Sequence, residues 1–296
     1  MRRRLLLGPV LIAALIGLLW LDEFVDLLGS PGWLATLTGE ATCPAGLAIL
    51  PIVVFLSMLG AAELAAIIRA KGVAASTPWT VAAAMVGLAA WGVAGTAAST
   101  MTSAAFAFSS VVGVLVGSMV FYARHKSSEG VTAAASGSLL SFAYLGVMPG
   151  FILALRAEHS AWVLLWVLLT IKACDTGAYF TGKAIGRHKL IPWLSPGKTW
   201  EGLGGGVVWS VVSGGLGAWL LVRAGIAAPG VGAGLVAGAV FALLGQGGDL
   251  LESMLKRDAG IKDSGASLPG FGGVLDIIDS PILVVPVAFW WLRMVG

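Results

Sequence analysis

The stretch PAGLAILPIVVFLSMLGAAELAAII, residues 44–68, decides the fold class. It contains one charged residue, Glu63, and it exceeds the run of about 20 apolar residues that a helix needs to cross a bilayer. The rest of the chain has the same character, since 58% of its 296 residues are hydrophobic and 11% are charged, against about 25% charged residues in a soluble domain. The sequence therefore predicts an all-α, polytopic integral membrane protein.

Apolar runs of nearly this length occur nine times along the chain. They cover residues 5–21, 44–68, 79–97, 103–123, 131–155, 160–182, 203–223, 230–250 and 281–295. Eight spans with a re-entrant piece are the alternative, because the last run is short and Pro149 and Gly150 interrupt the fifth. The first run follows three arginines, as in a signal peptide, but no clear small-residue cleavage site follows it, so we expect an uncleaved span.

The positions of the basic residues predict the topology. With a cytoplasmic N-terminus and nine spans, 14 of the 18 Lys and Arg residues fall in cytoplasmic segments, whereas Arg156, Arg223 and Arg293 fall outside. This bias follows the positive-inside rule. We therefore expect a multi-pass protein of the cell (inner) membrane, with loops 183–202 and 256–280 facing the cytoplasm.

Motif content divides the chain in two. Residues 1–155 form an N-terminal set of apolar spans with few motifs, and residues 156–296 form a C-terminal region that carries both large polar loops. The net charge of +3 gives no indication of a nucleic-acid partner. Cys43 and Cys174 lack metal-ligand spacing.

The first polar stretch is KACDTGAYFTGKAIGRHKLIPWLSPGKTWEG, residues 172–202. Lys172 and Asp175 share a helix face, so they form either a structural ion pair within a span or part of a polar cavity. The cations that follow could hold phosphate oxygens, or they could contact anionic lipid headgroups. Headgroup contact does not account for Glu201 or for the Ser-Pro-Gly turn at 195–197.

The second polar stretch begins with GDLLESMLKR, residues 248–257. Asp249, Glu252 and Lys256 share one helix face, and Ser253 lies near it. Taken alone, this pattern is also typical of the polar end of a span that meets water, with the long cations extending into the interface.

Two further carboxylates, Asp276 and Asp279, lie three residues apart. If they are helical, both can reach one divalent cation, and Mg²⁺ commonly joins a carboxylate or two to substrate phosphates. A competing interpretation makes Ser280 the N-cap and Pro281 the first residue of the last helix. Carboxylates for a metal beside cations for phosphates favour phosphoryl or nucleotidyl transfer, with a transporter that has charged loops as the alternative.

The stretch SMLKRDAGIKDSGASLPGFGGVLDIID, residues 253–279, resembles the signature of the phosphatidate cytidylyltransferase (CDP-diacylglycerol synthase) family. The upstream stretches CDTGAYFTGKAIGRHKL and SPGKTWEG resemble a second region of that family. Two positions depart from the pattern, because Phe271 and Ile277 stand where the family has His and Arg. We expect an active enzyme, with a non-catalytic paralogue as the alternative.

The resemblance implies that CTP and phosphatidic acid give CDP-diacylglycerol and pyrophosphate, with Mg²⁺, alone or with a second cation, as cofactor. It implies metal ligands at Asp249, Asp276 and Asp279. It implies catalytic residues at Lys198, Ser253, Lys256, Arg257, Lys262 and Asp263. It implies substrate contacts at Lys172, Asp175, Tyr179, Gly182, Ser195, Lys198, Thr199, Glu201, Gly272 and Gly273.

Other partners follow from the same resemblance. Membrane lipids surround the chain, and a homodimer is an option. The alternative activities are those of a CTP-dependent lipid kinase, or of a cytidylyltransferase for another lipid phosphate.

Overall fold

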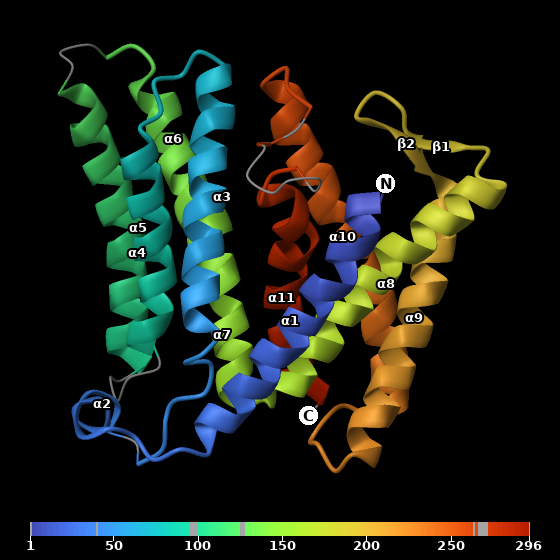
Figure 1. Ribbon diagram of the computed structural model, residues 1–296. Coiled ribbons are helices and arrows are strands. Elements are labelled where there is room, and N and C mark those ends of the chain that lie inside the picture. Colours follow the sequence, from blue (N-terminus) through green and yellow to red (C-terminus); the bar gives the residue numbers. More distant parts are fainter. Residues whose placement is uncertain are drawn as a thin grey trace. The chain divides into compact units, whose positions relative to one another are not determined.

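The chain is mostly helical (Figure 1). The computed structural model describes residues 2–39, 41–94, 100–124, 128–262, 264–265 and 272–295. The elements, in chain order, are α1 (Arg2–Asp26), α2 (Gly32–Thr38), α3 (Leu50–Ala70), α4 (Thr77–Ala94), α5 (Thr100–Ala123), α6 (Val131–Ser141), the π-helical η1 (Phe142–Val147), α7 (Met148–Glu158), α8 (Ala161–Ile185), β1 (Lys189–Ile191), β2 (Ser195–Thr199), α9 (Trp200–Arg223), α10 (Val231–Asp258) and α11 (Leu275–Val295).

Within the described ranges, seven helices are long and apolar enough to cross a membrane. They are α3, α5, the continuous α6–η1–α7 helix, α8, α9, α10 and α11. Helices α1 and α4 lie on the two remaining apolar runs. Every predicted run thus coincides largely with a helix, and the prediction of a polytopic, mostly helical membrane protein is confirmed.

The fifth run is one helix from Val131 to Glu158, without the interruption expected at Pro149. Proline has no N–H, and its ring collides with the carbonyl group four residues earlier in an α-helix. The wider π turn of η1 ends at Val147, two residues before Pro149. Single π turns occur inside α-helices, so the helix continues through this segment. Gly150 leaves room for Trp91, whose Nε1 donates a hydrogen bond to the Val147 carbonyl oxygen at 2.9 Å.

The last run is longer than expected, because α11 begins at Leu275 and contains Pro281 and Pro286 in its interior. The interpretation of Ser280 as an N-cap and Pro281 as the first helical residue is therefore wrong. The backbone N–H groups at the actual start of α11 donate to carboxylates instead. Both Asp276 and Asp279 consequently lie within this helix.

The chain forms two compact units, one of residues 1–157 and 258–276, and one of residues 158–257 and 277–296. In the first, α3, α4, α5 and α6 stand side by side (Figure 1). Ala83, Val114 and Phe142 form a buried cluster among these helices. The functional division predicted at residue 155 stays a prediction.

A buried ion cluster fixes one end of the first unit. The Arg156 side chain is 3% exposed and pairs with Asp22, Glu23 and Asp26, its Nε lying 2.6 Å from Asp22 Oδ2. The other oxygen of Asp22 accepts the N–H groups of Ala48 and Ile49, directly before α3. The ends of α1 and α7 and the start of α3 therefore meet, as alternating spans require.

Glycine brings the helices of the second unit together. A Cβ on Gly177 of α8 would lie 2.6 Å from Trp209 of α9, and one on Gly214 of α9 would lie 2.3 Å from the Gly234 carbonyl oxygen of α10. Small residues at such contacts allow close helix packing within a membrane. This packing gives the glycines at these helix contacts a structural role.

A β-hairpin departs from the all-α expectation. Strands β1 and β2 pair antiparallel between α8 and α9, with Lys189 opposite Thr199 and Ile191 opposite Ser195. Pro192 and Pro196 disfavour a helix in this segment. Pairing of the two strands gives the backbone N–H and C=O groups of this segment hydrogen-bond partners without a helix.

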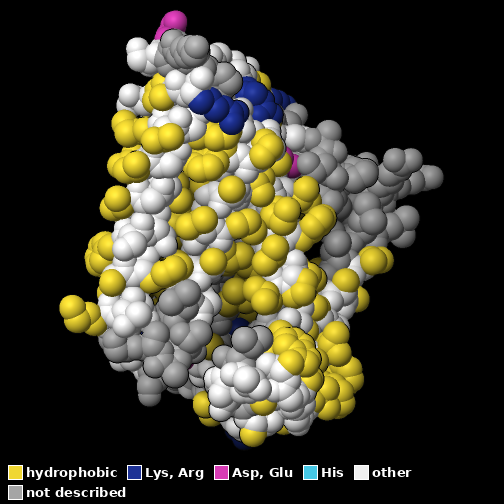
Figure 2. Space-filling view, turned by 90° about the vertical axis from the view of Figure 1, so that its left-hand side faces the viewer, with side chains coloured by type: hydrophobic (Ala, Val, Ile, Leu, Met, Phe, Trp, Pro, Cys, Tyr) yellow, Lys and Arg dark blue, Asp and Glu magenta, His cyan; other side chains and the backbone are white. Residues whose placement is uncertain are grey.

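Side chains exposed on the helices are largely apolar. Figure 2 shows one face on which hydrophobic side chains cover the middle, while Lys and Arg gather near one end. On α5, Phe108 is 74% exposed and Val120 is 68% exposed. Such exposure is expected where lipid is the solvent.

Cysteine labelling tests the predicted orientation. His188→Cys and Lys262→Cys should react with an impermeant maleimide only from the cytoplasmic side, and Gly32→Cys only from outside, because of the bias in basic residues. Native Cys43 and Cys174 are buried, so the parent protein measures the background. Labelling of position 262 from outside would overturn the orientation.

Candidate active site

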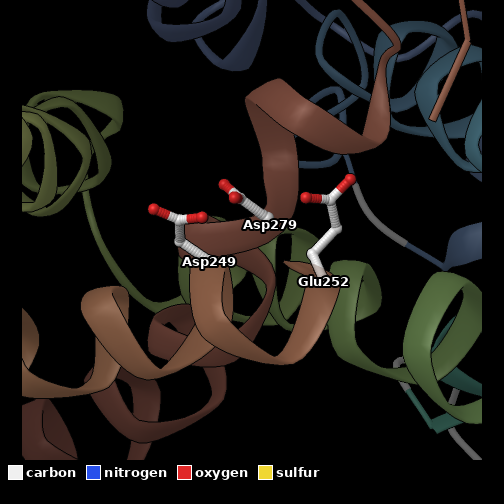
Figure 3. A group of neighbouring side chains, drawn as sticks. All are labelled: Asp249, Glu252 and Asp279. Atoms are coloured by element: carbon white, nitrogen blue, oxygen red, sulfur yellow. The ribbon is translucent and has the colours of Figure 1, made fainter. Parts of the chain in front are cut away.

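The close approach of α10 and α11 creates the centre of the site. A Cβ on Gly248 would lie 2.5 Å from the Asp279 carbonyl oxygen, so only glycine allows this backbone contact. Asp249 follows directly on α10, with Glu252 one turn later. Figure 3 shows the carboxyl groups of Asp249, Glu252 and Asp279 gathered on one side of these helices.

Oxygen atoms of these three carboxylates lie within 4.8 Å of one another. Glu252 is 1% exposed and Asp279 is 5% exposed. Like charges this close, two of them on buried side chains, repel strongly unless a cation or protons offset them. Oxygen donors in such a group fit a hard divalent cation such as Mg²⁺.

Two lysines border the carboxylates. Lys198 Nζ, from β2, lies 2.6 Å from Asp249 Oδ2, and Lys256 Nζ lies 2.5 Å from Glu252 Oε2. Both lysine side chains are largely buried, at 17% and 11% exposed. Cations held at fixed positions beside a metal-capable group suit an anionic substrate such as a polyphosphate.

A series of side-chain hydrogen bonds runs from Lys198 toward α8. Lys198 Nζ donates to Gln246 Oε1 at 2.9 Å, Gln246 Nε2 donates to Asp175 Oδ1 at 3.4 Å, and Lys172 Nζ donates to Asp175 Oδ2 at 3.0 Å. A cavity of about 500 Å³ lies beside these hydrogen-bonded side chains, with Tyr179 also in its wall. Its volume is in the range of small-molecule sites.

The hairpin and the start of α9 hold Lys198 in place. Thr199 is the N-cap of α9, and its Oγ1 accepts the Gly202 N–H at 3.1 Å. The Glu201 carboxylate accepts the backbone N–H groups of Arg187 and His188 and contacts the His188 ring at 2.6 Å. Glu201 thus shapes the basic segment that precedes β1.

Removal of the N-cap gives a test of this local structure. Thr199→Ala should destabilise the protein by about 1 kcal/mol, because the Gly202 N–H loses its acceptor inside the protein. Thr199→Ser keeps the hydroxyl and is the matched control. Thermal unfolding of purified protein in detergent measures both variants, and equal midpoints for the two would contradict the capping role.

Other residues expected in the site make the following contacts, and their predicted roles stay predictions. Ser253 Oγ lies 3.5 Å from Asp249 Oδ1, and Arg257 Nε lies 3.5 Å from the Leu194 carbonyl oxygen. Gly182 lines the cavity. Ser195 begins β2, opposite Ile191.

Of the remaining signature residues that the structure describes, those from Lys262 to Asp276 belong to the first unit. Gly273 N–H and Ser264 Oγ donate to Asp276 Oδ2 at 2.7 and 2.9 Å. Gly272 has φ +97°, in the left-handed region that favours glycine. Lys262 is exposed. Asp263 and Phe271 lie outside the described residues, so their predicted roles stay predictions.

Three residues of these polar networks were not predicted as site residues. Glu252 follows Asp249 by three positions and Gln246 precedes it by three, so helical spacing from Asp249 could have indicated both. Glu63 is a lone carboxylate in an apolar run, which is a functional signal in a membrane protein. Nothing in its spacing indicated what it contacts.

Comparison with known proteins gives the family. The cytidylyltransferase family matches residues 30–295, nearly the whole chain. The chain belongs to this family. A protein of Haemophilus influenzae named phosphatidate cytidylyltransferase is 37% identical over 160 residues, which cover 50% of this chain and 54% of that protein.

Two other family relatives are similar to the same extent. A Staphylococcus haemolyticus protein named phosphatidate cytidylyltransferase is 38% identical over 158 residues, covering 50% of this chain and 55% of that protein. Escherichia coli "Uncharacterized protein YnbB" is 38% identical over 159 residues, covering 49% and 52%. The chain spans about half the length of these relatives. The resemblance to the family is thus confirmed.

Proposed function

We propose that this cytidylyltransferase transfers the cytidylyl group of CTP to phosphatidic acid, giving CDP-diacylglycerol and pyrophosphate. An oxygen of the lipid phosphate forms a new bond to the α-phosphorus of CTP. The bond between that phosphorus and the oxygen bridging to the β-phosphate breaks, and pyrophosphate takes the electron pair. Both substrates are anions, so the site must offset negative charge.

One observation carries the proposal: three carboxylates, two of them buried, converge beside two largely buried lysines, in a member of this family. Asp249, Glu252 and Asp279 would hold Mg²⁺. The bound ion would supply electrostatic stabilisation to phosphate oxygens. Lys198 and Lys256 would add positive charge where the substrates meet.

The acceptor needs little help with its proton. A phosphate monoester has a second pKa of about 6, so at neutral pH it is already a nucleophilic anion. A general base is therefore not required, and the Phe at 271 does not by itself preclude the reaction. The chain's task is to bind and orient two anions.

The cavity beside Lys198 supports binding of a small polar group. Its wall contains Asp175, Lys198, Gln246 and Asp249 together with Ala178 and Leu203. Positioned charges next to apolar surface suit a phosphorylated lipid headgroup or a nucleotide. We place this chemistry at the cytoplasmic face of the membrane, where CTP is available.

Product analysis with several acceptors tests the proposal. Purified protein in detergent with phospholipid should release pyrophosphate from CTP and Mg²⁺ when phosphatidate is added, and excess EDTA should abolish release. Diacylglycerol and a polyprenol should not serve. Release of CDP with either alcohol would instead indicate a lipid kinase, and pyrophosphate release with only another lipid phosphate would overturn phosphatidate as acceptor.

A further inference from the structure

Glu63 of α3 lies far in sequence from the segment before α11, yet contacts it directly. Its Oε1 accepts the Val274 N–H at 2.9 Å, and its Oε2 accepts the Leu275 N–H at 3.0 Å. The residue is 7% exposed. A carboxylate here satisfies N–H groups that a helix leaves unpaired at its start, and its charge is favourable there.

A second carboxylate completes this arrangement. Asp276 Oδ2 accepts the Gly273 N–H at 2.7 Å, so three successive N–H groups, of Gly273, Val274 and Leu275, donate to carboxylates. Ser264 Oγ lies 2.9 Å from Asp276 Oδ2 and 3.3 Å from Glu63 Oε2. The hydroxyl therefore links the two acids.

The glycines of this segment leave room for the same side chains. The three atoms nearest to a Cβ on Gly265 would all belong to Glu63, the closest being Oε1 at 2.9 Å. A Cβ on Gly273 would lie 2.0 Å from Ser264 Oγ and 2.6 Å from Glu63 Oε2. The segment thus surrounds the Glu63 carboxylate, and any residue larger than glycine at 265 or 273 would displace it.

We propose that Glu63 is a positioning residue for catalysis: it caps α11 from a separate span and so fixes the first turn, which carries Asp276 and leads to Asp279. This role rests on the proposed function only where turnover is concerned. Glu63 is outside the stretches that resemble the family signature.

Hydrogen exchange tests the cap without any substrate. In Glu63→Gln, the Val274 and Leu275 amides should exchange at least about tenfold faster, because bonds to a charged acceptor are lost. Peptides from α8 and α9 should be unchanged. Glu129→Gln, at an exposed carboxylate, is the matched control. Parent-like protection in Glu63→Gln would overturn the cap.

Turnover tests the positioning role. Glu63→Gln should lower kcat by about tenfold or more while changing the KM for CTP by less than about threefold, since a positioning residue acts through the start of α11. Glu63→Asp keeps the charge and should recover part of both protection and kcat. A loss confined to KM, or no recovery in Glu63→Asp, would contradict the positioning role.

A double-mutant cycle keeps the test decisive if Glu63 variants fold poorly. Gly265→Ala alone should lower protection and kcat, because its Cβ displaces Glu63. In the Glu63→Ala background the same change should have little further effect, since the space is then free. Additive effects would overturn the proposal. Inactive parent protein with protected amides would refute the proposed function while supporting the cap.

Discussion

Asp279→Asn should lower turnover by at least about 100-fold, the scale expected when electrostatic stabilisation of a transition state is lost. Asp279 is buried on α11, and its carboxylate lies close to those of Asp249 and Glu252. The amide keeps the size of the side chain but loses the negative charge that a divalent cation requires. Steady-state rates of CDP-diacylglycerol formation at several Mg²⁺ concentrations measure the effect.

The matched control is Asp258→Asn, at an exposed carboxylate that pairs with Lys71 on the surface. Surface pairs of this kind contribute little, so its turnover should equal that of the parent. Thermal unfolding establishes that both variants are folded. Turnover within a few-fold of the parent for folded Asp279→Asn would remove Asp279 from the proposed metal site.

Lys198→Met should lower kcat/KM by about 100-fold, because the variant keeps an unbranched apolar stem but loses the charge that we propose offsets substrate phosphates. The same change removes the partner of Asp249 and the donor to Gln246. Initial rates over a range of CTP and phosphatidate concentrations give kcat and KM separately.

Lys71→Met is the control for this variant, since Lys71 is half-exposed and pairs with the exposed Asp258. It should leave kcat/KM unchanged. A folded Lys198→Met protein as active as Lys71→Met would show that Lys198 serves the structure of the hairpin and not the reaction.

The membrane spans could be predicted because the bilayer imposes a simple requirement of length and apolarity. The start of α11 could not, since it depends on Glu63, whose contacts with Val274 and Leu275 are distant in sequence. Pro281 is typical of a first helical residue, whereas α11 begins at Leu275. Local sequence also gave no indication of the π turn before Pro149.

The candidate site was predictable in parts. Asp249 and Lys256 share a helix face by spacing alone, but their proximity to Asp279 depends on the contact between Gly248 and α11. The two acids of the last motif, expected to act together, make different contacts: Asp276 accepts from Ser264 and Gly273, whereas Asp279 lies with Asp249 and Glu252. Spacing of three residues cannot distinguish these environments.

The fate of each phosphate of CTP tests the central claim most directly. Purified protein is incubated with phosphatidate, Mg²⁺ and CTP labelled in either the α- or the γ-phosphate, and the lipid is extracted. Cytidylyl transfer predicts that the α label enters the lipid as CDP-diacylglycerol while the γ label leaves as pyrophosphate. Lipid labelled from the γ-phosphate, or no lipid labelled from either, would contradict the account.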